Sequence, residues 1–181
     1  PTMHPQLCEL LALARRPEIG RVTVNSNGLR LARDPHLAAE LADLGAYVVL
    51  SLDTLDGATS ERIHGRDIVQ EKLAALENLR AAGVPTTLLM VLIGGVNEGE
   101  LSTLWDLMRE EPMVRSLTIQ TMTYTGQGGG TFGPRKAITV EGVEERLLGA
   151  TKGSLGPTSF VPLPTAHPLC YSVCYLLLDD E

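Results

Sequence analysis

The chain has 181 residues, of which 44% are hydrophobic and 20% charged, and this predicts one globular domain whose core needs no disulfide bonds. Its formal net charge of −7 argues against a nucleic-acid partner held mainly by phosphate neutralisation, and no apolar run approaches the roughly 20 residues of a membrane span. Aromatic residues make up only 4% of the chain, so Leu, Val and Ala must form most of the core.

The first half of the chain alternates helical patterns with short apolar runs. The spacing of its leucines predicts a helix over Pro5–Arg16, and Arg21–Asn25 is a predicted strand that stops at an Asn-rich turn. An Asp-Pro start and a final glycine predict a helix over Asp34–Gly45. The continuous apolar run Ala46–Asp53 predicts a strand covered on both faces. A polar loop and a helix over Ile68–Gly83 follow.

The second half continues this alternation. The remaining elements are, in chain order, a strand over Thr86–Gly95, a helix over Gly99–Glu111, a strand over Ser116–Gly126, a Gly-rich loop and a helix over Thr139–Thr151. From Gly153 the pattern weakens into Pro-rich, irregular chain. We therefore expect two parts, 1–152 with the regular elements and 153–181 as an irregular, cysteine-containing C-terminal segment.

Four apolar strands separated by helices predict βαβ units and an α/β fold with a parallel sheet covered by helices. The right-handed crossover rule leaves two architectures, a doubly wound open sheet or part of a (β/α) barrel. The first strand is not followed by G-x-G-x-x-G, which disfavours the dinucleotide-binding version of the open sheet. In both architectures, ligands bind at the carboxyl ends of the strands.

Polar residues gather at or just beyond these strand ends. They are Asn25, Asn27, Ser51, Asp53, Asn97 and Gln120. The set offers neutral hydrogen-bonding groups and a single carboxylate, with no acid–base pair, no nucleophile beside a base and no two-metal carboxylate cluster. Such a set of residues suits the binding of a polar, zwitterionic small molecule, with the chemical step carried out by something other than these side chains. The alternative is that the Asn residues only form turns, although Ser51 and Asp53 should share one face of an apolar strand.

Three cysteines do not make a disulfide framework, and two of them lie close together near the C-terminus. Cys170 and Cys174 are spaced C-x-x-x-C, with His167 three residues ahead, so their thiolates could share a metal ion or an iron–sulfur cluster. Burial for packing is the alternative, and it is the expected role of Cys8, which has leucines around it. This cysteine usage favours a reducing, cytoplasmic setting.

Together with the polar residues and cysteines described above, four segments that cover nearly the whole chain resemble the radical SAM superfamily. "PTMHPQL" is similar to the end of the family's G-G-E-P-T-x-H-P-x-L segment, and "VNSNGLRLARDPHLAAELADLGAYVVLSLDTLD" to its T-N-G-L-R-L-A unit and the S-x-D strand after it. "ALENLRAAGVPTTLLMVLIGGVNEGEL" resembles the helix and G-V-N strand that follow. "HPLCYSVCYL" resembles the cysteine-bearing C-terminal segment of the branch that contains tetraether lipid synthases and pterin-precursor radical methyltransferases.

The resemblance implies a partial (β/α) barrel of the radical SAM type that binds S-adenosylmethionine. The residues implied to bind it are, in chain order, Pro1 and Thr2 around the methionine amino group, Asn25 and Asn27 at the first strand end, Ser51 and Asp53 beside the ribose and carboxylate, Asn97 near the adenine or ribose, and Gln120 at the last strand. Cys170 and Cys174 are implied as ligands of an auxiliary iron centre.

The same resemblance implies that part of the enzyme lies upstream of Pro1. The family's C-x-x-x-C-x-x-C loop for its [4Fe–4S] cluster and the first residues of the G-G-E-P-T segment are not in this sequence. We therefore expect a fragment that is inactive alone. A barrel that lacks its first strands would expose a sheet edge and apolar helix surface, so we also expect the chain to associate with itself.

For the intact enzyme, the resemblance implies reductive cleavage of S-adenosylmethionine to a 5′-deoxyadenosyl radical, with a flavodoxin or ferredoxin as electron donor. The radical would activate a C–H bond of a small-molecule or lipid substrate for methylation or C–C coupling. Two alternatives remain open. One is a cyclase like those of molybdenum-cofactor biosynthesis, which share the strand-and-loop pattern, and the other is a non-catalytic α/β module that binds a small molecule or a partner.

Overall fold

The computed structural model describes residues 1–133, 137–167 and 170–177. The chain divides into two compact units, the first formed by Pro1–Val91 and Asp106–Gln120 and the second by Leu92–Trp105 and the residues from Thr121 onward. Outside the described residues lie 134–136 of the predicted Gly-rich loop and 168–169 and 178–181 of the predicted C-terminal segment. Within the described residues, no helix has the length and apolar character needed to cross a membrane.

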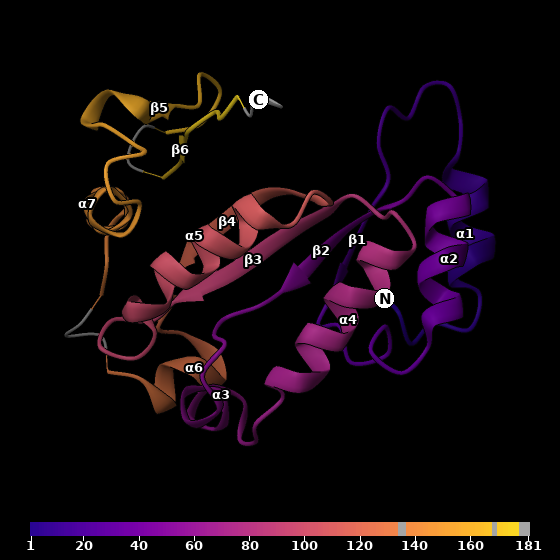
Figure 1. Cartoon of the computed structure of the whole chain (residues 1–181), viewed down its shortest axis with the longest axis horizontal. Helices are drawn as coiled ribbons and strands as arrows, with labels where there is room; N and C mark the ends of the chain where they lie inside the picture. The colour runs from indigo at the N-terminus through magenta and orange to yellow at the C-terminus, as the bar shows by residue number, and fades with distance from the viewer. Residues whose placement is uncertain (134–136, 168–169, 178–181) are drawn as a thin grey trace. The chain divides into compact units, whose positions relative to one another are not determined.

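A four-stranded parallel sheet has its strands in the order β1-β2-β3-β4 (Figure 1). The strands are β1 (Thr23–Ser26), β2 (Tyr47–Ser51), β3 (Thr86–Leu92) and β4 (Val114–Thr121). β2 pairs in parallel with both β1 and β3, and its residue Leu50 lies opposite Ser26 and Leu88. The predicted α/β fold is confirmed, and a parallel sheet with helices between its strands is consistent with a partial radical SAM barrel.

The five predicted helices are present, each a little shorter than expected: α1 (Leu7–Ala14), α2 (Pro35–Asp43), α4 (Val69–Ala81), α5 (Leu101–Glu110) and α7 (Val140–Ala150). α2 begins as predicted, because the Asp34 carboxylate accepts a hydrogen bond from the Leu37 amide at 3.2 Å. In the first unit, α2 contacts α4, and the Arg15 guanidinium beyond α1 donates to the Asp43 carbonyl of α2 at 3.0 Å. Figure 1 shows these three helices beside β1 and β2.

Two short helices occupy segments that were predicted as loops. α3 (Gly57–His64) lies in the predicted polar loop, where the Asp56 carboxylate caps the Thr59 amide at 2.7 Å and Gly65 ends the helix at φ +77°. α6 (Gly126–Thr131) lies in the predicted Gly-rich loop. Both predictions were wrong because neither segment carries the apolar spacing that marks a helix in sequence. For α3, the cap and the final glycine were the available signals.

The predicted apolar faces of α1 and β2 need correction. Of the α1 leucines, Leu7 and Leu11 are buried, whereas Leu10 and Leu13 are 51% and 64% exposed, so the helix buries one narrow stripe. β2 alternates, with Val48 and Leu50 fully buried and Tyr47, Val49 and Ser51 half-buried. One face of β2 is therefore covered by the core and the other only partly covered, which was not expected from its continuous apolar run.

Leucine dominates the core, as the scarcity of aromatic residues predicted. The largest side chains that are almost completely buried are Leu31, Leu37, Leu41, Leu50, Leu52, Leu79, Leu88, Met90, Leu92, Leu101, Leu104 and Val48. Most of them lie on β2, β3 and the helices of the first unit. Burial of these aliphatic side chains is the main favourable term in folding.

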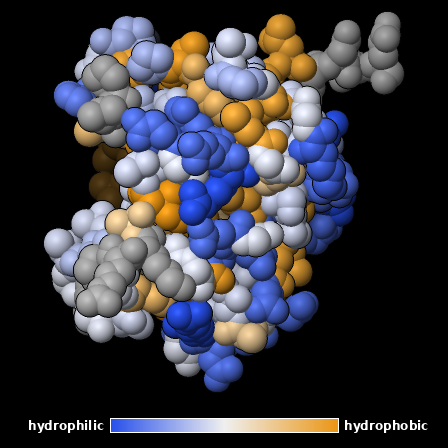
Figure 2. Space-filling view, turned by 90° about the vertical axis from the view of Figure 1, so that its left-hand side faces the viewer, coloured by the Kyte–Doolittle hydropathy of each residue, from blue (hydrophilic) through white to orange (hydrophobic). Residues whose placement is uncertain are grey.

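The second unit has less regular structure. An ion pair of 2.7 Å joins Arg146 of α7 to Glu98, in the 3₁₀ turn η1 (Glu98–Glu100). The predicted irregular C-terminal segment contains a 3₁₀ turn, η3 (Pro157–Ser159), and a minimal antiparallel hairpin, β5 (Val161–Pro162) with β6 (Ser172–Val173). Large apolar side chains near the hairpin are exposed, among them Tyr175 and Leu177. Figure 2 shows apolar residues interspersed with hydrophilic ones on the face that it presents.

Gly28 is the residue at which the turn after β1 meets the core. Its φ is +82°, and a Cβ added there would lie 2.7 Å from Leu50 Cδ1 and 3.1 Å from Ala75 Cβ. Leu50 is completely buried, so it has no free space into which to move. Only glycine satisfies both the left-handed backbone and this close approach.

We therefore expect Gly28→Ala to lower the free energy of unfolding by about 2–4 kcal/mol, from backbone strain and overpacking together. Gly45→Ala is the matched control, because Gly45 also has a positive φ of +61° but has no atom within 4 Å of an added Cβ. It should cost only about 1 kcal/mol. Urea denaturation of both variants checks this, and equal losses would show that the contact with Leu50 contributes nothing.

Candidate functional site

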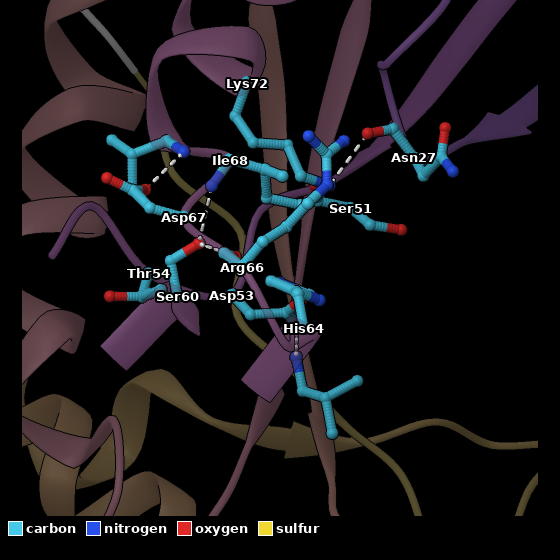
Figure 3. A network of polar contacts seen from close by, with 12 residues as sticks. Asn27, Ser51, Asp53, Thr54, Ser60, His64, Arg66, Asp67, Ile68 and Lys72 are labelled. Carbon is cyan, nitrogen blue, oxygen red and sulfur yellow. Dashed lines mark hydrogen bonds and ion pairs between the residues drawn. The ribbon is translucent and has the colours of Figure 1, made fainter. Parts of the chain in front are cut away.

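A pocket of about 380 Å³ lies in the first unit, at the carboxyl ends of β1 and β2. It is lined by Asn27, Leu29, Ser51, Asp53, His64, Arg66, Ile68 and Lys72. These residues come from the turn after β1, the end of β2, the end of α3, and the loop and first turns of α4. Figure 3 shows the lining residues other than Leu29 within a network of polar contacts. The location agrees with the expectation that parallel strands present ligands at their carboxyl ends.

Lys72 is the most deeply buried charged residue of this network. Only 3% of it is exposed, and its ammonium donates to the carbonyl of Asn27 at 2.8 Å and to that of Ser51 at 2.7 Å. The sequence directs the side chain inward because Lys72 shares a helix face with the buried residues Ala75 and Leu79, three and seven positions later. A single side chain of α4 thereby joins the ends of two strands.

Asp53 extends the pairing of β2 and β3 beyond the last residue of β2. In the parallel register Ser51 pairs with Leu89, and two residues further on Asp53 Oδ1 accepts a hydrogen bond from the Val91 amide at 2.8 Å. The other carboxylate oxygen lies 3.5 Å from His64 Nε2. The Asp53 residue is 7% exposed, so its carboxylate is largely removed from water and both of its oxygens have partners.

The charges of this network act on one another. Burial lowers the pKa of His64; the Lys72 charge lowers this pKa further, and the Asp53 carboxylate opposes both effects. Burial also lowers the pKa of Lys72, again opposed by the charge of Asp53. Asp53 is therefore a counter-charge shared by His64 and Lys72, and it offsets part of the desolvation that lowers both pKa values.

Ser60 fixes the loop that brings Arg66 to the pocket. This serine is 1% exposed, and its hydroxyl accepts from the Ile68 amide at 3.0 Å and donates to the Arg66 carbonyl at 3.4 Å. The Arg66 guanidinium makes an ion pair of 3.2 Å with Glu71. Loop 65–68 is thus held to α3 at one end and to α4 at the other.

Of the residues predicted to bind a cofactor, three line this pocket: Asn27, Ser51 and Asp53. The Asn27 side chain also accepts from the Leu29 amide at 3.2 Å, so the turn-forming role that was considered for it is present as well. Ser51 and Asp53 line the same pocket from one strand and its extension, as their alternate spacing predicted.

Thr2 lies at a neighbouring point of the first unit. It is 5% exposed, its hydroxyl oxygen lies 3.5 Å from that of Ser26, and its carbonyl accepts from the Arg30 guanidinium. Thr2 is therefore tied to the end of β1 without lining the pocket. Pro1 is exposed, and its carbonyl accepts from the His4 amide at 2.8 Å.

The other predicted residues do not line the pocket either. Asn25 and Gln120 are exposed, on β1 and β4 of the first unit. Asn97 belongs to the second unit and is 1% exposed, and its side-chain oxygen accepts from the Ile93 amide at 2.8 Å. This contact closes the turn after β3.

The two predicted iron ligands lie in the second unit. Cys170 is exposed and Cys174 half-buried, and burial raises the pKa of the Cys174 thiol, which disfavours the thiolate that a metal requires. The Cys170 amide donates to the His167 carbonyl at 2.9 Å, so His167 shapes this loop through its backbone. Cys8 is half-buried, and its thiol donates to Glu40 at 3.4 Å.

Across the described ranges 1–133, 137–167 and 170–177, no group of three or more His, Cys, Asp or Glu side chains could hold a metal ion. These residues therefore do not fit a four-ligand iron–sulfur cluster.

His64, Arg66 and Lys72 are the ionisable pocket residues that the sequence reasoning missed, and it also missed the apolar Leu29 and Ile68. Lys72 could have been found from its place among apolar residues at helical spacing in a predicted helix. His64 and Arg66 flank Gly65, so recognising α3 from its cap and its final glycine would have placed them at the end of the helix that follows β2. The contact between Asp53 and His64 was not foreseen either, because it joins residues whose spacing carries no motif.

Chemically, the pocket combines two neutral hydrogen-bonding side chains with one carboxylate and three groups that can carry positive charge. Asn27 and Ser51 offer polar atoms at the strand ends, and Leu29 and Ile68 supply apolar wall. This set suits a small polar ligand that carries charges of both signs and an apolar part. Nothing in it resembles a nucleophile activated by a neighbouring base.

Residues 1–108 match the family described as the Radical SAM superfamily. The match includes β1, β2, β3 and every residue that lines the pocket. It covers more than half of the chain.

Three curated relatives show how far the similarity extends. GTP 3′,8-cyclase of Cronobacter sakazakii is 29% identical over 135 residues, 73% of this chain and 40% of the relative. GTP 3′,8-cyclase of Chlorobaculum tepidum is 34% identical over 66% of this chain and 37% of the relative. The 7,8-dihydro-6-hydroxymethylpterin dimethyltransferase of Methanocaldococcus jannaschii is 24% identical over 100% of this chain and 36% of the relative. The chain thus spans about two fifths of the length of these relatives.

The lowered pKa of His64 predicts a loss of stability on acidification. Between the ordinary His pKa and the lower pKa of the folded state, the unfolded chain binds a proton that the folded chain does not, so the free energy of unfolding falls as pH falls. We expect the wild type to lose more stability than His64→Gln between about pH 7.5 and about pH 5. Urea denaturation across this range measures the difference.

His36→Gln is the control for this experiment, because His36 is exposed on α2 and lies outside the pocket. Its urea denaturation over the same pH range measures the effect of replacing a histidine that lies outside the pocket. If His64→Gln follows the wild-type curve, His64 does not titrate differently in the folded and unfolded states.

Proposed function

The chain belongs to the radical SAM superfamily, and from this membership we propose that its first unit binds S-adenosylmethionine in the pocket of Asn27, Ser51 and Asp53. We further propose that the protein works as a radical SAM enzyme on a C–H bond of its substrate. The observation that carries the proposal is that these three residues, each at or just beyond a strand end, line one pocket within the part of the chain that matches the family.

The character of the pocket supports this ligand. S-adenosylmethionine carries a carboxylate, an ammonium, a sulfonium and hydroxyl groups, so it requires polar partners of several kinds. Asn27 and Ser51 supply neutral hydrogen-bonding groups, and the Asp53 carboxylate and the Lys72 ammonium supply opposite charges beside them. Leu29 and Ile68 would shield the bound ligand from water.

Bound S-adenosylmethionine supplies the radical that abstracts hydrogen from the substrate, so the side chains need no acid–base dyad of their own for that step. The role of these side chains is to bind and to orient the cofactor. Asn27 and Ser51 would hold polar groups of the cofactor, and Lys72 and Asp53 hold the strand ends that carry these side chains. Because the described residues do not fit an iron–sulfur cluster, we assign no step to one within this chain.

For the intact enzyme we propose methylation or C–C coupling of a small-molecule or lipid substrate in the cytoplasm, with a flavodoxin or ferredoxin as electron donor. The similarity to the pterin dimethyltransferase extends over the whole chain, including the cysteine-bearing C-terminal segment, and this supports the methyltransferase and tetraether-synthase branch. Cys170 and Cys174 would then be ligands of an auxiliary iron centre whose remaining ligands come from elsewhere.

A second candidate is cyclisation of a nucleotide, as the cyclase of molybdenum-cofactor biosynthesis performs. It is favoured by the relatives named GTP 3′,8-cyclase, which reach 34% identity over 66% of the chain. Consumption of GTP by the full-length enzyme would support this candidate, and methylation of a pterin would support the first. A chain that binds neither iron nor S-adenosylmethionine would instead be a non-catalytic α/β module.

We predict that Ser51→Ala weakens binding of S-adenosylmethionine about 5- to 10-fold, the loss expected for one hydrogen bond. The variant removes the hydroxyl and leaves the Ser51 carbonyl in place for Lys72. Ser116→Ala is the matched control, because Ser116 lies on β4 of the same unit and its hydroxyl pairs with Thr87 at 2.8 Å. Isothermal titration calorimetry measures both, and equal affinities for the two variants would exclude Ser51 from the site.

The C-terminal cysteines carry a separate prediction. Because the remaining ligands of this centre come from elsewhere in the proposal, the test uses the intact enzyme. After anaerobic reconstitution, the double variant Cys170→Ser, Cys174→Ser should contain less iron than the wild type, because the auxiliary centre loses two thiolate ligands. Iron and sulfide assays measure this. Equal iron content in the two proteins would show that the cysteines are not iron ligands.

A further inference from the structure

We infer that Lys72 is a positioning residue that sets the distance between the end of β1 and the end of β2, and through it the relative placement of the Asn27 and Ser51 side chains. The inference about the strand ends stands on the contacts of Lys72 alone. Its consequence for ligand binding rests on the proposed function.

The two carbonyls that Lys72 binds occupy matching places in the sheet. The last paired residues of β1 and β2 are Ser26 and Leu50. One residue further along each strand come Asn27 and Ser51, whose carbonyls accept from the ammonium at 2.8 and 2.7 Å. The ammonium therefore joins the strands at the next step of their register, where β1 turns away at Gly28 and direct pairing stops.

The stem of Lys72 is confined as well as its charged end. The residue is 3% exposed, and an added Cβ on Gly28 would lie 4.0 Å from Lys72 Cδ and closer still to Leu50 and Ala75. The side chain thus passes through a tightly packed part of the core before it reaches the carbonyls. Confinement of this kind lets one side chain hold a geometry, because little freedom remains to be lost.

The charge arrangement explains why an ammonium can remain at this place. Two carbonyl dipoles accept from it, and Asp53 is a nearby negative charge that favours its protonated form. The other titratable groups that line the pocket are His64 and Arg66. Removing the ammonium would leave two carbonyl groups without this donor at the edge of the pocket, and burial of an unpaired carbonyl is costly.

Asn27 and Ser51 both line the pocket, and each is held through its own backbone by Lys72. A shift of either carbonyl moves the side chain of the same residue. Lys72 therefore acts on a ligand through these two residues.

Four variants test the inference. Lys72→Met keeps the length of the stem and removes the ammonium, and Lys72→Arg keeps a charged group with several donors. Leu79→Ala is the matched control, because Leu79 lies on the same helix, is completely buried and is not among the residues that line the pocket. Lys72→Gln, one bond shorter with a single amide donor group, replaces Lys72→Met if that variant does not fold.

The first measurement is amide hydrogen exchange in the ligand-free chain. We expect Lys72→Met to speed exchange about 10-fold at the amides that report on the two strand ends, which are those of Gly28, Leu29 and Leu52. The amides of Tyr47 and Val48, at the other end of β2, should exchange no faster than in Leu79→Ala. Lys72→Arg should restore rates to within about threefold of wild type. A uniform increase, or no increase, overturns the inference.

The second measurement is binding of S-adenosylmethionine by calorimetry. Lys72→Met should bind about 10-fold more weakly than Leu79→Ala at equal folded fraction, and Lys72→Arg should recover most of the affinity. Affinity equal to that of Leu79→Ala overturns the role in ligand placement. If the wild type binds no S-adenosylmethionine, the proposed function fails, and the exchange pattern alone then decides the positioning role of Lys72.

Discussion

The ammonium of Lys72, held between the carbonyls of Asn27 and Ser51, is the contact on which the arrangement of the first unit depends. It joins β1, β2 and α4 at the point where parallel pairing ends and a ligand pocket begins. Gly28 makes the contact possible, because its positive φ turns the chain away from β1 without a side chain that would displace Leu50. At the carboxyl ends of β1 and β2, the buried Lys72 contacts thus support the polar residues that line the pocket.

Asp53 is the counterpart of this cation. Its carboxylate extends the pairing of β2 with β3 through the Val91 amide, lies beside His64 and favours the charged form of Lys72. A buried ammonium without such a partner would be strongly destabilising. The carboxylate that sequence reasoning singled out as a ligand-binding group is therefore also a structural one, and the two roles are compatible because a carboxylate has two oxygens and several lone pairs.

Membership of the radical SAM superfamily is the basis for proposing that the pocket at the carboxyl ends of β1 and β2 binds S-adenosylmethionine. In the proposed function the cofactor supplies the radical, and the protein has to bind, orient and shield it. A pocket with hydrogen-bonding side chains fixed from beneath by paired charges meets this requirement without a catalytic dyad. Relatives of this chain carry the names of different reactions, a GTP 3′,8-cyclase and a pterin dimethyltransferase.

The sequence by itself determined the α/β alternation, the five longer helices, the parallel sheet and the polar character of the strand ends, because each depends on residues close together along the chain. Asp34 and Pro35 start α2 through local capping, and Ser51 and Asp53 share a face through the two-residue period of a strand. Only the tertiary structure decided which side chains contact one another and which are buried. The contacts of Lys72 join residues 45 and 21 positions away, and the burial of Leu7 rather than Leu10 follows from which face of α1 meets its neighbours. Such distant contacts are selected by packing and charge in the folded chain, and no local spacing records them.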